Sequence, residues 1–308
     1  MSLPPPSGVA LFGKLPAQGD FLRLDATGPT AELLVSWLHE AIEPVHRAGL
    51  ALPAAPVRFL LVAPGGEAAV GTMIASRDKV GRAFPLCLFA GVPAASVVRQ
   101  FPAVPAAAAE FCAAAEALLG RAAELAPAAL AEAARALPRP RDAREVEAAV
   151  SAAAAERPLA EVLARAFPAP DGAAAYGIST LGAALKQVRG GPPAKATLAV
   201  EATAGDDAER WLWLELVRRG LGWSAPPGLF WTGGRLVVSL GPPPATVLAQ
   251  LCDPSHPPSK IWPLRTDRAE AIAAARRGLA PEVQHALASP DGPATRLFEL
   301  LPAGGGRG

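Results

Sequence analysis

The sequence predicts an α/β protein: a three-layer α/β/α sandwich around a mixed, largely antiparallel sheet, with an Ala-rich helical insertion. Short apolar runs rich in β-forming residues occur near both ends of the 308-residue chain, and a block of helical pattern separates them. Strands on both sides of such a block fit one sheet with an insertion better than two separate domains. We therefore expect one domain over residues 1–308, including a helical insertion at 102–170 and a C-terminal extension at 253–308.

Three consecutive strands are expected to form the middle of the sheet. They cover residues 57–63, 68–75 and 85–90, each an apolar run with β-forming residues. The Pro-Gly-Gly sequence at 64–66 is typical of a tight hairpin turn, because Gly readily adopts a positive φ. A charged segment, residues 77–82, separates the second strand from the third.

The N-terminal part predicts one further strand and one long helix. Residues 9–12 form the strand, which ends in the loop 13–21. Apolar residues then recur at helical spacing through 30–47, and the opposite side of this helix is polar. Thr30 is the expected N-cap and Gly49 the expected stop, so this helix should pack on one face of the sheet.

The insertion is dominated by Ala, the residue with the highest intrinsic helix propensity. Several of its expected helices begin with Pro, which suits the first helical turn. One interpretation is a helical layer that covers the sheet, and the other is a surface for a partner protein. The expected helices are 105–121, 127–137, 143–155 and 158–167.

The mixed pattern returns after the insertion. Asp206 or Asp207 is the expected N-cap of the first long helix there. A proline-rich crossing follows Cys252, and the Gly-rich tail at 304–308 is expected to be disordered. The expected helices are 179–188, 206–219, 245–251 and 267–277, and the expected strands are 197–202, 229–231 and 236–240.

Composition excludes several classes of function. The net charge is +1, so no global field attracts nucleic acid or anionic lipid. The three cysteines, Cys87, Cys112 and Cys252, are far apart and form no CxxC pair, which argues against disulfides and zinc and fits a reducing compartment. Neither a signal peptide nor an uninterrupted apolar run of membrane-spanning length is present. We expect a cytoplasmic protein without nucleic-acid binding, membrane insertion or a cofactor.

Motifs for catalysis are weak. Neither GxxxxGK[ST] nor GxGxxG occurs in a strand–helix context, so nucleotide binding is not expected. Residues 177–181 resemble an incomplete GxSxG, and we interpret Ser179 or Thr180 as a helix N-cap instead. Cys252 and its near neighbours Asp253 and His256 are adjacent in sequence, whereas a catalytic triad is a spatial arrangement. The four histidines lack the spacing of metal ligands.

The candidate site is a cluster of charged residues in two loops at strand ends. If the first strand lies beside the central three, these loops meet at one edge of the sheet. Internal salt bridges that hold the loops are one interpretation, and a recognition surface for a protein or a charged ligand is the other. The six residues are Lys14, Asp20, Arg77, Asp78, Lys79 and Arg82.

The same loops carry a family resemblance. Residues 13–21 (GKLPAQGDF) and 76–86 (SRDKVGRAFPL) resemble the two signature segments of the TagF family, also called ImpM, found in type VI secretion gene clusters. Residues 228–234 (GLFWTGG) are similar to a later segment of the family, S-x-W-W-T-x-G, with departures at Gly228 and Phe230. The resemblance covers residues 9–91 well and residues 211–251 moderately, whereas the Ala-rich block and the residues beyond Cys252 look specific to this chain.

This resemblance implies a non-catalytic cytoplasmic accessory protein with a three-layer α/β/α fold. It further implies post-translational repression of type VI secretion by binding a forkhead-associated (FHA) scaffold protein, in a pathway with a kinase and a phosphatase. The expected partner is this FHA scaffold or another type VI secretion component. The alternative is a small-ligand-sensing or enzymatic α/β domain, in which Lys14, Asp20 and Arg82 line a pocket.

Overall fold

The computed structural model gives the fold for most of the chain. The expected disordered tail and the first residue of the strand expected at 197–202 lie outside the described residues. The structure describes residues 8–64, 66–92, 94–168, 172–196, 198–223, 225–257 and 260–301.

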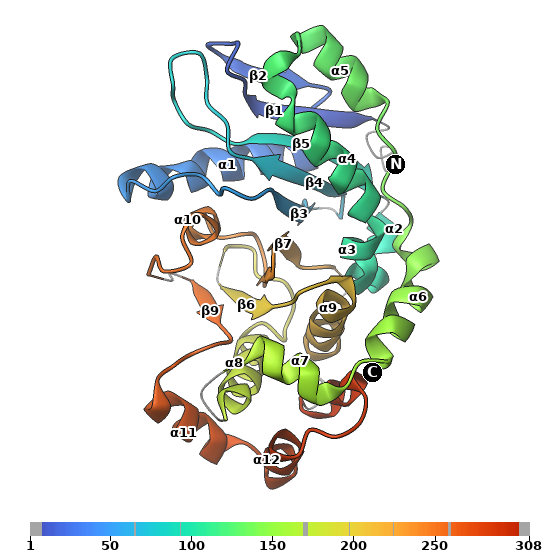
Figure 1. Ribbon diagram of the computed structural model, residues 1–308, viewed down its shortest axis with the longest axis vertical. Coiled ribbons are helices and arrows are strands. Elements are labelled where there is room, and N and C mark those ends of the chain that lie inside the picture. Colours follow the sequence, from blue (N-terminus) through green and yellow to red (C-terminus); the bar gives the residue numbers. More distant parts are fainter. Residues whose placement is uncertain are drawn as a thin grey trace.

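The described residues form one nine-stranded sheet in the order β2-β1-β5-β4-β3-β7-β8-β6-β9 (Figure 1). Every neighbouring pair is antiparallel except β6 and β9, so the sheet is mixed and largely antiparallel, as predicted. The strands are β1 Val9–Lys14, β2 Phe21–Leu24, β3 Val57–Val62, β4 Ala68–Ile74, β5 Leu86–Val92, β6 Ala199–Thr203, β7 Gly228–Thr232, β8 Arg235–Ser239 and β9 Ile261–Pro263.

Helices cover both faces of this sheet. The α-helices are α1 Pro29–Arg47, α2 Ala94–Gln100, α3 Val104–Ala107, α4 Ala109–Gly120, α5 Pro127–Arg135, α6 Ala143–Ala155, α7 Leu159–Ala166, α8 Ala173–Gln187, α9 Asp207–Leu221, α10 Thr246–Cys252, α11 Ala269–Gly278 and α12 Pro281–Ala288. The short 3₁₀ helices are η1 Phe101–Ala103, η2 Ala122–Glu124 and η3 Ala294–Glu299.

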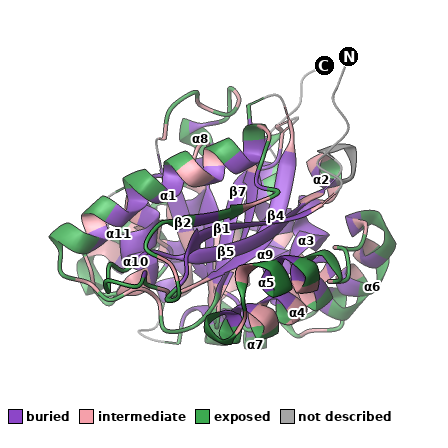
Figure 2. Cartoon of the chain, turned by 90° about the horizontal axis from the view of Figure 1, so that it is seen from above, coloured by how far each residue is buried: buried purple, intermediate pink, exposed green. Residues whose placement is uncertain are grey.

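The two faces of the sheet bury two separate apolar cores (Figure 2). Successive residues of a strand point to opposite faces, so Phe59 and Leu61 pack on the side of α1 and α10, whereas Leu60 packs on the side of α4 and α9. Helices of the Ala-rich block lie on this second side, where α4 packs on β4 and α6 packs on α9. The three-layer α/β/α sandwich is therefore confirmed.

The three central strands are confirmed as the middle of the sheet, since β5, β4 and β3 are consecutive and each pairs on both sides. Strands β2 and β9 were missed. Strand β2 has four residues and β9 has three, too few for an alternating pattern to stand out. Helix α12 and the residues from 94 to 103, now α2 and η1, were also missed.

Two predicted N-caps are wrong. Pro29 takes the first turn of α1 and Gly28 is its N-cap, while Thr30 lies inside the helix and donates to Glu67 Oε2 instead. Ser179 and Thr180 lie inside α8, which begins at Ala173 because its first residues are strong helix formers. The cap of α9 is confirmed, since the Asp206 carboxylate accepts a hydrogen bond from the Glu209 amide.

The helix expected at 105–121 is instead two helices. Helix α3 ends at Ala107 and α4 begins at Ala109, and the segments on either side of this break are bent by 53°. A run of alanines favours helix at every position, so its pattern carries no signal for where the axis changes direction.

Candidate functional site

Two loops meet at one end of the sheet, where β1 and β5 pair antiparallel. The β1–β2 loop comprises residues 15–20, and the β4–β5 loop comprises residues 75–85 (Figure 1). Gly13 lets β1 approach the start of β5: its φ is +143°, and a Cβ at this position would lie 2.1 Å from the carbonyl oxygen of Pro85. No side chain fits there, which explains a glycine at this point of the chain.

Hydrogen bonds between the loops hold them together. The Ser76 hydroxyl donates to the carbonyl oxygen of Lys14 at 2.7 Å, and the Lys79 amide donates to the carbonyl oxygen of Gln18 at 2.8 Å. The Arg82 guanidinium donates to the carbonyl oxygen of Gly19 at 2.9 Å. The residue after Gly19 is Asp20, so the structure places Asp20 and Arg82 on the same side of the molecule.

Asp78 is the centre of this arrangement. Its Oδ1 accepts hydrogen bonds from the Val80 amide at 3.1 Å and the Arg82 amide at 2.9 Å. Its Oδ2 accepts from Lys14 Nζ at 2.7 Å and from Arg82 Nε at 2.6 Å. Asp78 and Lys14 are both buried, at 2% and 7% exposure. The carboxylate therefore binds both loops at once.

Burial of the Asp78 carboxylate raises its pKa, but the hydrogen bonds from Lys14 and from the amide and guanidinium of Arg82 outweigh this effect and hold the pKa well below its usual range. Asp78 is thus charged at neutral pH. Lys14 and Arg82 both form ion pairs with Asp78, which agrees with the structural interpretation of these three residues.

The other three residues of the predicted cluster face solvent. Asp20, Arg77 and Lys79 are exposed, and none of them forms an ion pair with a residue that the structure describes. The backbone of Arg77 forms a β-bridge with Ala83, so the loop carries this side chain on a fixed backbone. The cluster is therefore divided into an inner group that sets the geometry and an outer group free to meet a partner.

Two apolar side chains also belong to this surface, and sequence reasoning missed them. Phe21 is 39% exposed and Val80 is 72% exposed, and among the described residues no other large hydrophobic side chain is classed as exposed. Both lie within or directly beside the two loops. An apolar residue between charged neighbours, as in Lys79-Val80-Gly81-Arg82, was the signal that could have found Val80.

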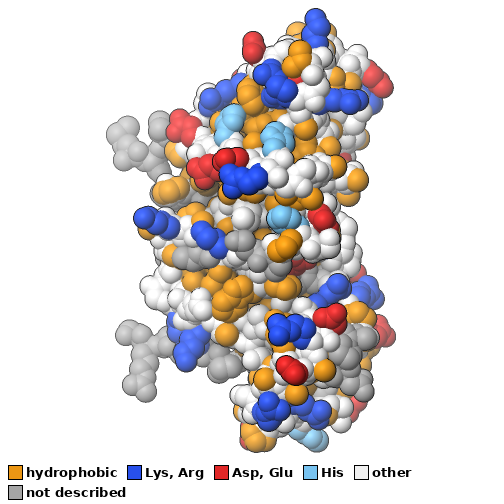
Figure 3. Space-filling model, turned by 90° about the vertical axis from the view of Figure 1, so that its left-hand side faces the viewer, with side chains coloured by type: hydrophobic (Ala, Val, Ile, Leu, Met, Phe, Trp, Pro, Cys, Tyr) orange, Lys and Arg blue, Asp and Glu red, His pale blue; other side chains and the backbone are white. Residues whose placement is uncertain are grey.

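Phe21 rests on a group of aromatic rings. It stacks on Phe12 with ring centroids 5.4 Å apart and meets the edges of Phe84 at 4.8 Å and of His39 on α1 at 5.1 Å. Lys14 Nζ lies 5.3 Å from the Phe21 centroid. Figure 3 views the side of the molecule on which α1 and these loops project, where Lys and Arg side chains lie among hydrophobic ones at the upper end. The exposed ring is thus held in one orientation.

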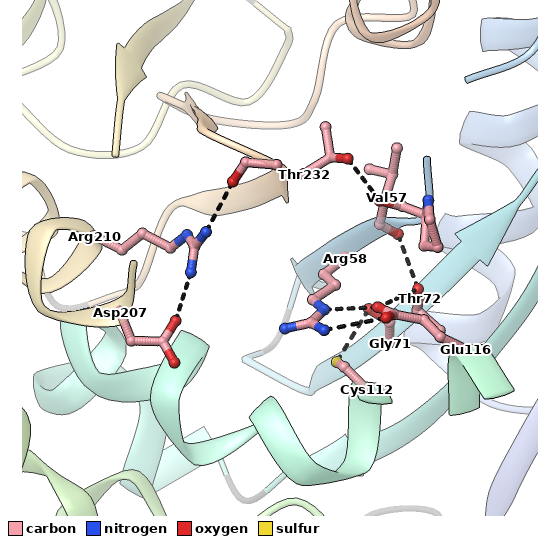
Figure 4. A network of polar contacts seen from close by, with 11 residues as sticks. Val57, Arg58, Gly71, Thr72, Cys112, Glu116, Asp207, Arg210 and Thr232 are labelled. Carbon is pink, nitrogen blue, oxygen red and sulfur yellow. Dashed lines mark hydrogen bonds and ion pairs between the residues drawn. The ribbon is translucent and has the colours of Figure 1, made fainter. Parts of the chain in front are cut away.

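A second polar group lies between the sheet and α4 (Figure 4). Arg58 on β3 donates through Nε to Glu116 Oε1 at 2.6 Å and through its second nitrogen to Oε2 at 3.1 Å. Thr72 donates to Glu116 Oε1, and the Cys112 thiol donates to the carbonyl oxygen of Gly71 at 3.8 Å. Burial raises the pKa of Cys112 to about 12. This cysteine is therefore a thiol at neutral pH, and a nucleophile would need the thiolate.

The neighbouring residues Cys252, Asp253 and His256 do not form a catalytic arrangement. Burial raises the pKa of Cys252 to about 12, and the Asp253 carboxylate accepts from the amide and the hydroxyl of Ser255, at 2.8 and 2.7 Å. His256 contacts Asp253 through its own backbone amide. Within the described residues, no three His, Cys, Asp or Glu side chains are grouped so that they could hold a metal ion.

In the part of the chain that is described, no one helix has the length and apolar character needed to cross a membrane. One bent pair, Val97–Ala107 with Ala109–Gly120, meets these criteria by length and composition only.

Residues 10–137 match the family model of the TagF N-terminal domain, which is described as type VI secretion system-associated. This part of the chain is therefore similar to the TagF N-terminal domain. The match contains both loops and continues through α4 and α5, so the first part of the Ala-rich block is not specific to this chain, contrary to expectation. This match connects residues 10–137 with type VI secretion.

The chain was also compared with solved structures and with curated proteins. Solved structures similar to this chain include PA0076 from Pseudomonas aeruginosa PAO1, with 19% sequence identity and a TM-score of 0.48, covering 83% of this chain and 99% of that one. Among curated proteins, none matches this chain.

Proposed function

We propose that this protein is a non-catalytic accessory protein of a type VI secretion system that acts in the cytoplasm as a post-translational repressor. In this proposal it binds an FHA-domain scaffold protein through the β1–β2 and β4–β5 loops. The TagF N-terminal domain supports the secretion role, since both loops lie inside the matched range.

One observation favours the two loops as the binding surface. The two exposed large hydrophobic residues of the described chain, Phe21 and Val80, lie at the loops that also present the unpaired cations of Arg77 and Lys79. Aromatic and Arg side chains are enriched at the centres of protein interfaces. Because Asp78 already holds both loops, a partner would lose little free energy in ordering them.

The small-ligand alternative has weaker support. It requires the cationic groups of Lys14 and Arg82 to face a shared pocket with Asp20. Instead, Lys14 Nζ and Arg82 Nε both bind Asp78 Oδ2, and Lys14 is buried. A ligand would have to break this arrangement before it could use the Lys14 ammonium.

Val80→Asp tests the proposed surface. Val80 is 72% exposed, so the variant should keep its circular dichroism spectrum and melting temperature. An aspartate at the centre of an interface would be desolvated without a partner, so we expect binding to the purified FHA scaffold to weaken by about tenfold or more. Isothermal titration calorimetry measures the Kd, and secretion by a deletion strain that expresses the variant should no longer be repressed.

Ala274→Asp, an exposed position on α11, is the matched control and should bind like the unaltered protein. Equal Kd values for Val80→Asp and this control would show that the loops are not the interface. Absence of any binding by the unaltered protein would reject the scaffold as the partner.

A further inference from the structure

A groove runs beside the β4–β5 loop, on the side of α4. Its floor is apolar and consists of Leu15, Leu86 and Leu119, which are 0%, 1% and 2% exposed. Arg77 lies at its rim and is exposed. The groove is thus continuous with the loops, since Arg77 lines the groove and is also one of the outer residues of the charged cluster.

Small residues keep this groove open. Helix α4 ends at Gly120, and the short helix η2 that follows contributes Ala122 and Ala123 to the wall. None of these three residues has a side chain longer than a methyl group, so none of them reaches across to the loop. The opposite wall is fixed, because the hydroxyl of Ser76 donates to the carbonyl oxygen of Lys14.

The size of the groove indicates what it can hold. Its volume is about 200 Å³. Sites for small molecules typically measure about 300–1,000 Å³ and enclose most of the ligand. A groove below this range with an apolar floor suits a single large apolar side chain that projects from another protein.

The charge at the rim indicates what should flank that side chain. The guanidinium of Arg77 forms no ion pair with a described residue, and neither does the ammonium of Lys79 two positions further on. Complementary charges across an interface increase specificity and the association rate. An acidic residue of the partner would therefore meet Arg77 when the apolar side chain enters the groove.

We propose that this groove receives a large apolar side chain of the FHA scaffold, next to an aspartate or glutamate that binds Arg77. The proposal rests on the proposed function and adds the chemistry of the segment that the protein recognises. The proposed occupant of the groove is a short segment of the scaffold in which a large apolar residue lies beside an aspartate or glutamate.

Two variants test the groove by calorimetry with the purified FHA scaffold at 0.15 M NaCl. Ala123→Trp fills the groove from an exposed position, and Arg77→Glu reverses the rim charge. Each should raise the Kd by about tenfold or more. The matched controls on α11, Ala273→Trp and Arg277→Glu, are also at exposed positions and should stay within about twofold of the unaltered protein.

The outcomes separate the two proposals. If the unaltered protein does not bind the scaffold, the proposed function is overturned and the groove proposal with it. If the unaltered protein binds, Val80→Asp weakens binding and the two groove variants bind normally, only the groove proposal is overturned.

A second measurement does not depend on how the variants fold. Tiled 15-residue peptides of the scaffold are titrated against the full-length unaltered protein. The peptides that bind should contain a large apolar residue beside Asp or Glu, and changing either residue to Ala should abolish binding. Binding only by peptides without this pair, or by none of the peptides, would contradict the proposal.

Discussion

Asp78 is buried and accepts four hydrogen bonds, whereas Arg77 and Lys79 on either side of it are exposed. Three consecutive charged residues look alike in a sequence pattern. The turn decides between them: the Asp78 amide donates to the carbonyl oxygen of Arg82, the Gly81 amide donates to that of Asp78, and Gly81 has a φ of +90°. This tight turn directs the carboxylate inward and its neighbours outward.

Asp78→Asn should lower the melting temperature by several degrees at pH 7, because the neutral amide binds Lys14 and Arg82 more weakly and leaves the buried Lys14 ammonium without a counter-charge. The folded-state pKa of Asp78 is depressed, so its stabilisation is present above the unfolded pKa of about 3.9 and is lost as pH falls towards the folded value. The difference between variant and unaltered protein should be constant above about pH 5 and shrink below about pH 4.

Thermal melts from pH 2.5 to 8 measure this difference. The matched control is Asp20→Asn in the same cluster, whose exposed side chain forms no ion pair with a described residue and should have little effect. A difference that does not change with pH would show that the charge of Asp78 is not what holds the loops.

At the scale of elements, β3 and α4 are joined by the paired hydrogen bonds of Arg58 and Glu116. The strand and the helix were each predicted from local pattern, with α4 as part of one longer helix. The contact between them was not predicted, because Arg58 and Glu116 are 58 positions apart in the sequence. Polar residues in an apolar strand and in an Ala-rich helix look like isolated exceptions until the layers are assembled. Their partnership explains why both are tolerated at partly buried positions.

Glu116→Gln should lower the free energy of unfolding by about 2 kcal/mol. In the unaltered protein the Arg58 guanidinium donates to two carboxylate oxygens, whereas the neutral amide of the variant offers only one acceptor oxygen. Urea denaturation followed by circular dichroism measures this change. Glu110→Gln, an exposed position on the same helix, is the matched control and should change the free energy by less than about 0.5 kcal/mol. Equal losses for both variants would mean that the pair between β3 and α4 contributes nothing specific.

At the scale of the whole molecule, the residues that match the TagF N-terminal domain supply only part of the nine-stranded sheet. Strand β3 lies within this range, but its outer edge pairs with β7 through Phe59 and Phe230. Helix α1 also depends on later residues, because Trp37 packs on Phe230 with ring centroids 4.9 Å apart and donates to the carbonyl oxygen of Pro244. The two halves of the sheet therefore share their cores.

A fragment of residues 1–137 should not fold cooperatively, because it exposes the edge of β3 and the apolar surfaces that β7 and α9 cover. We expect binding of the dye ANS and a broad melting transition for the fragment, and one sharp transition for the full chain. Co-expression with residues 138–308 should restore a sharp transition. A fragment with a sharp transition and dispersed amide NMR signals would show that the N-terminal domain is independent.

The sequence by itself determined the three central strands, the long helix α1, the helical character of the Ala-rich block and the positions of the two loops with their six charged residues. These features have local signals: apolar periodicity, turn residues and motif spacing over a few tens of residues. The sequence could not separate the ion-paired group of Asp78, Lys14 and Arg82, in which Asp78 and Lys14 are buried, from the exposed group of Asp20, Arg77 and Lys79, which form no ion pair with a described residue, because all six residues carry charge.

The tertiary structure decided that separation, the edge strands β2 and β9, the exposure of Phe21 and Val80, and the groove beside Arg77. Each depends on contacts between segments far apart in the chain: the loops meet because β1 lies beside β5, and the groove exists because α4 ends next to both loops. Local pattern reports which residues alternate, whereas burial is set by what packs against them.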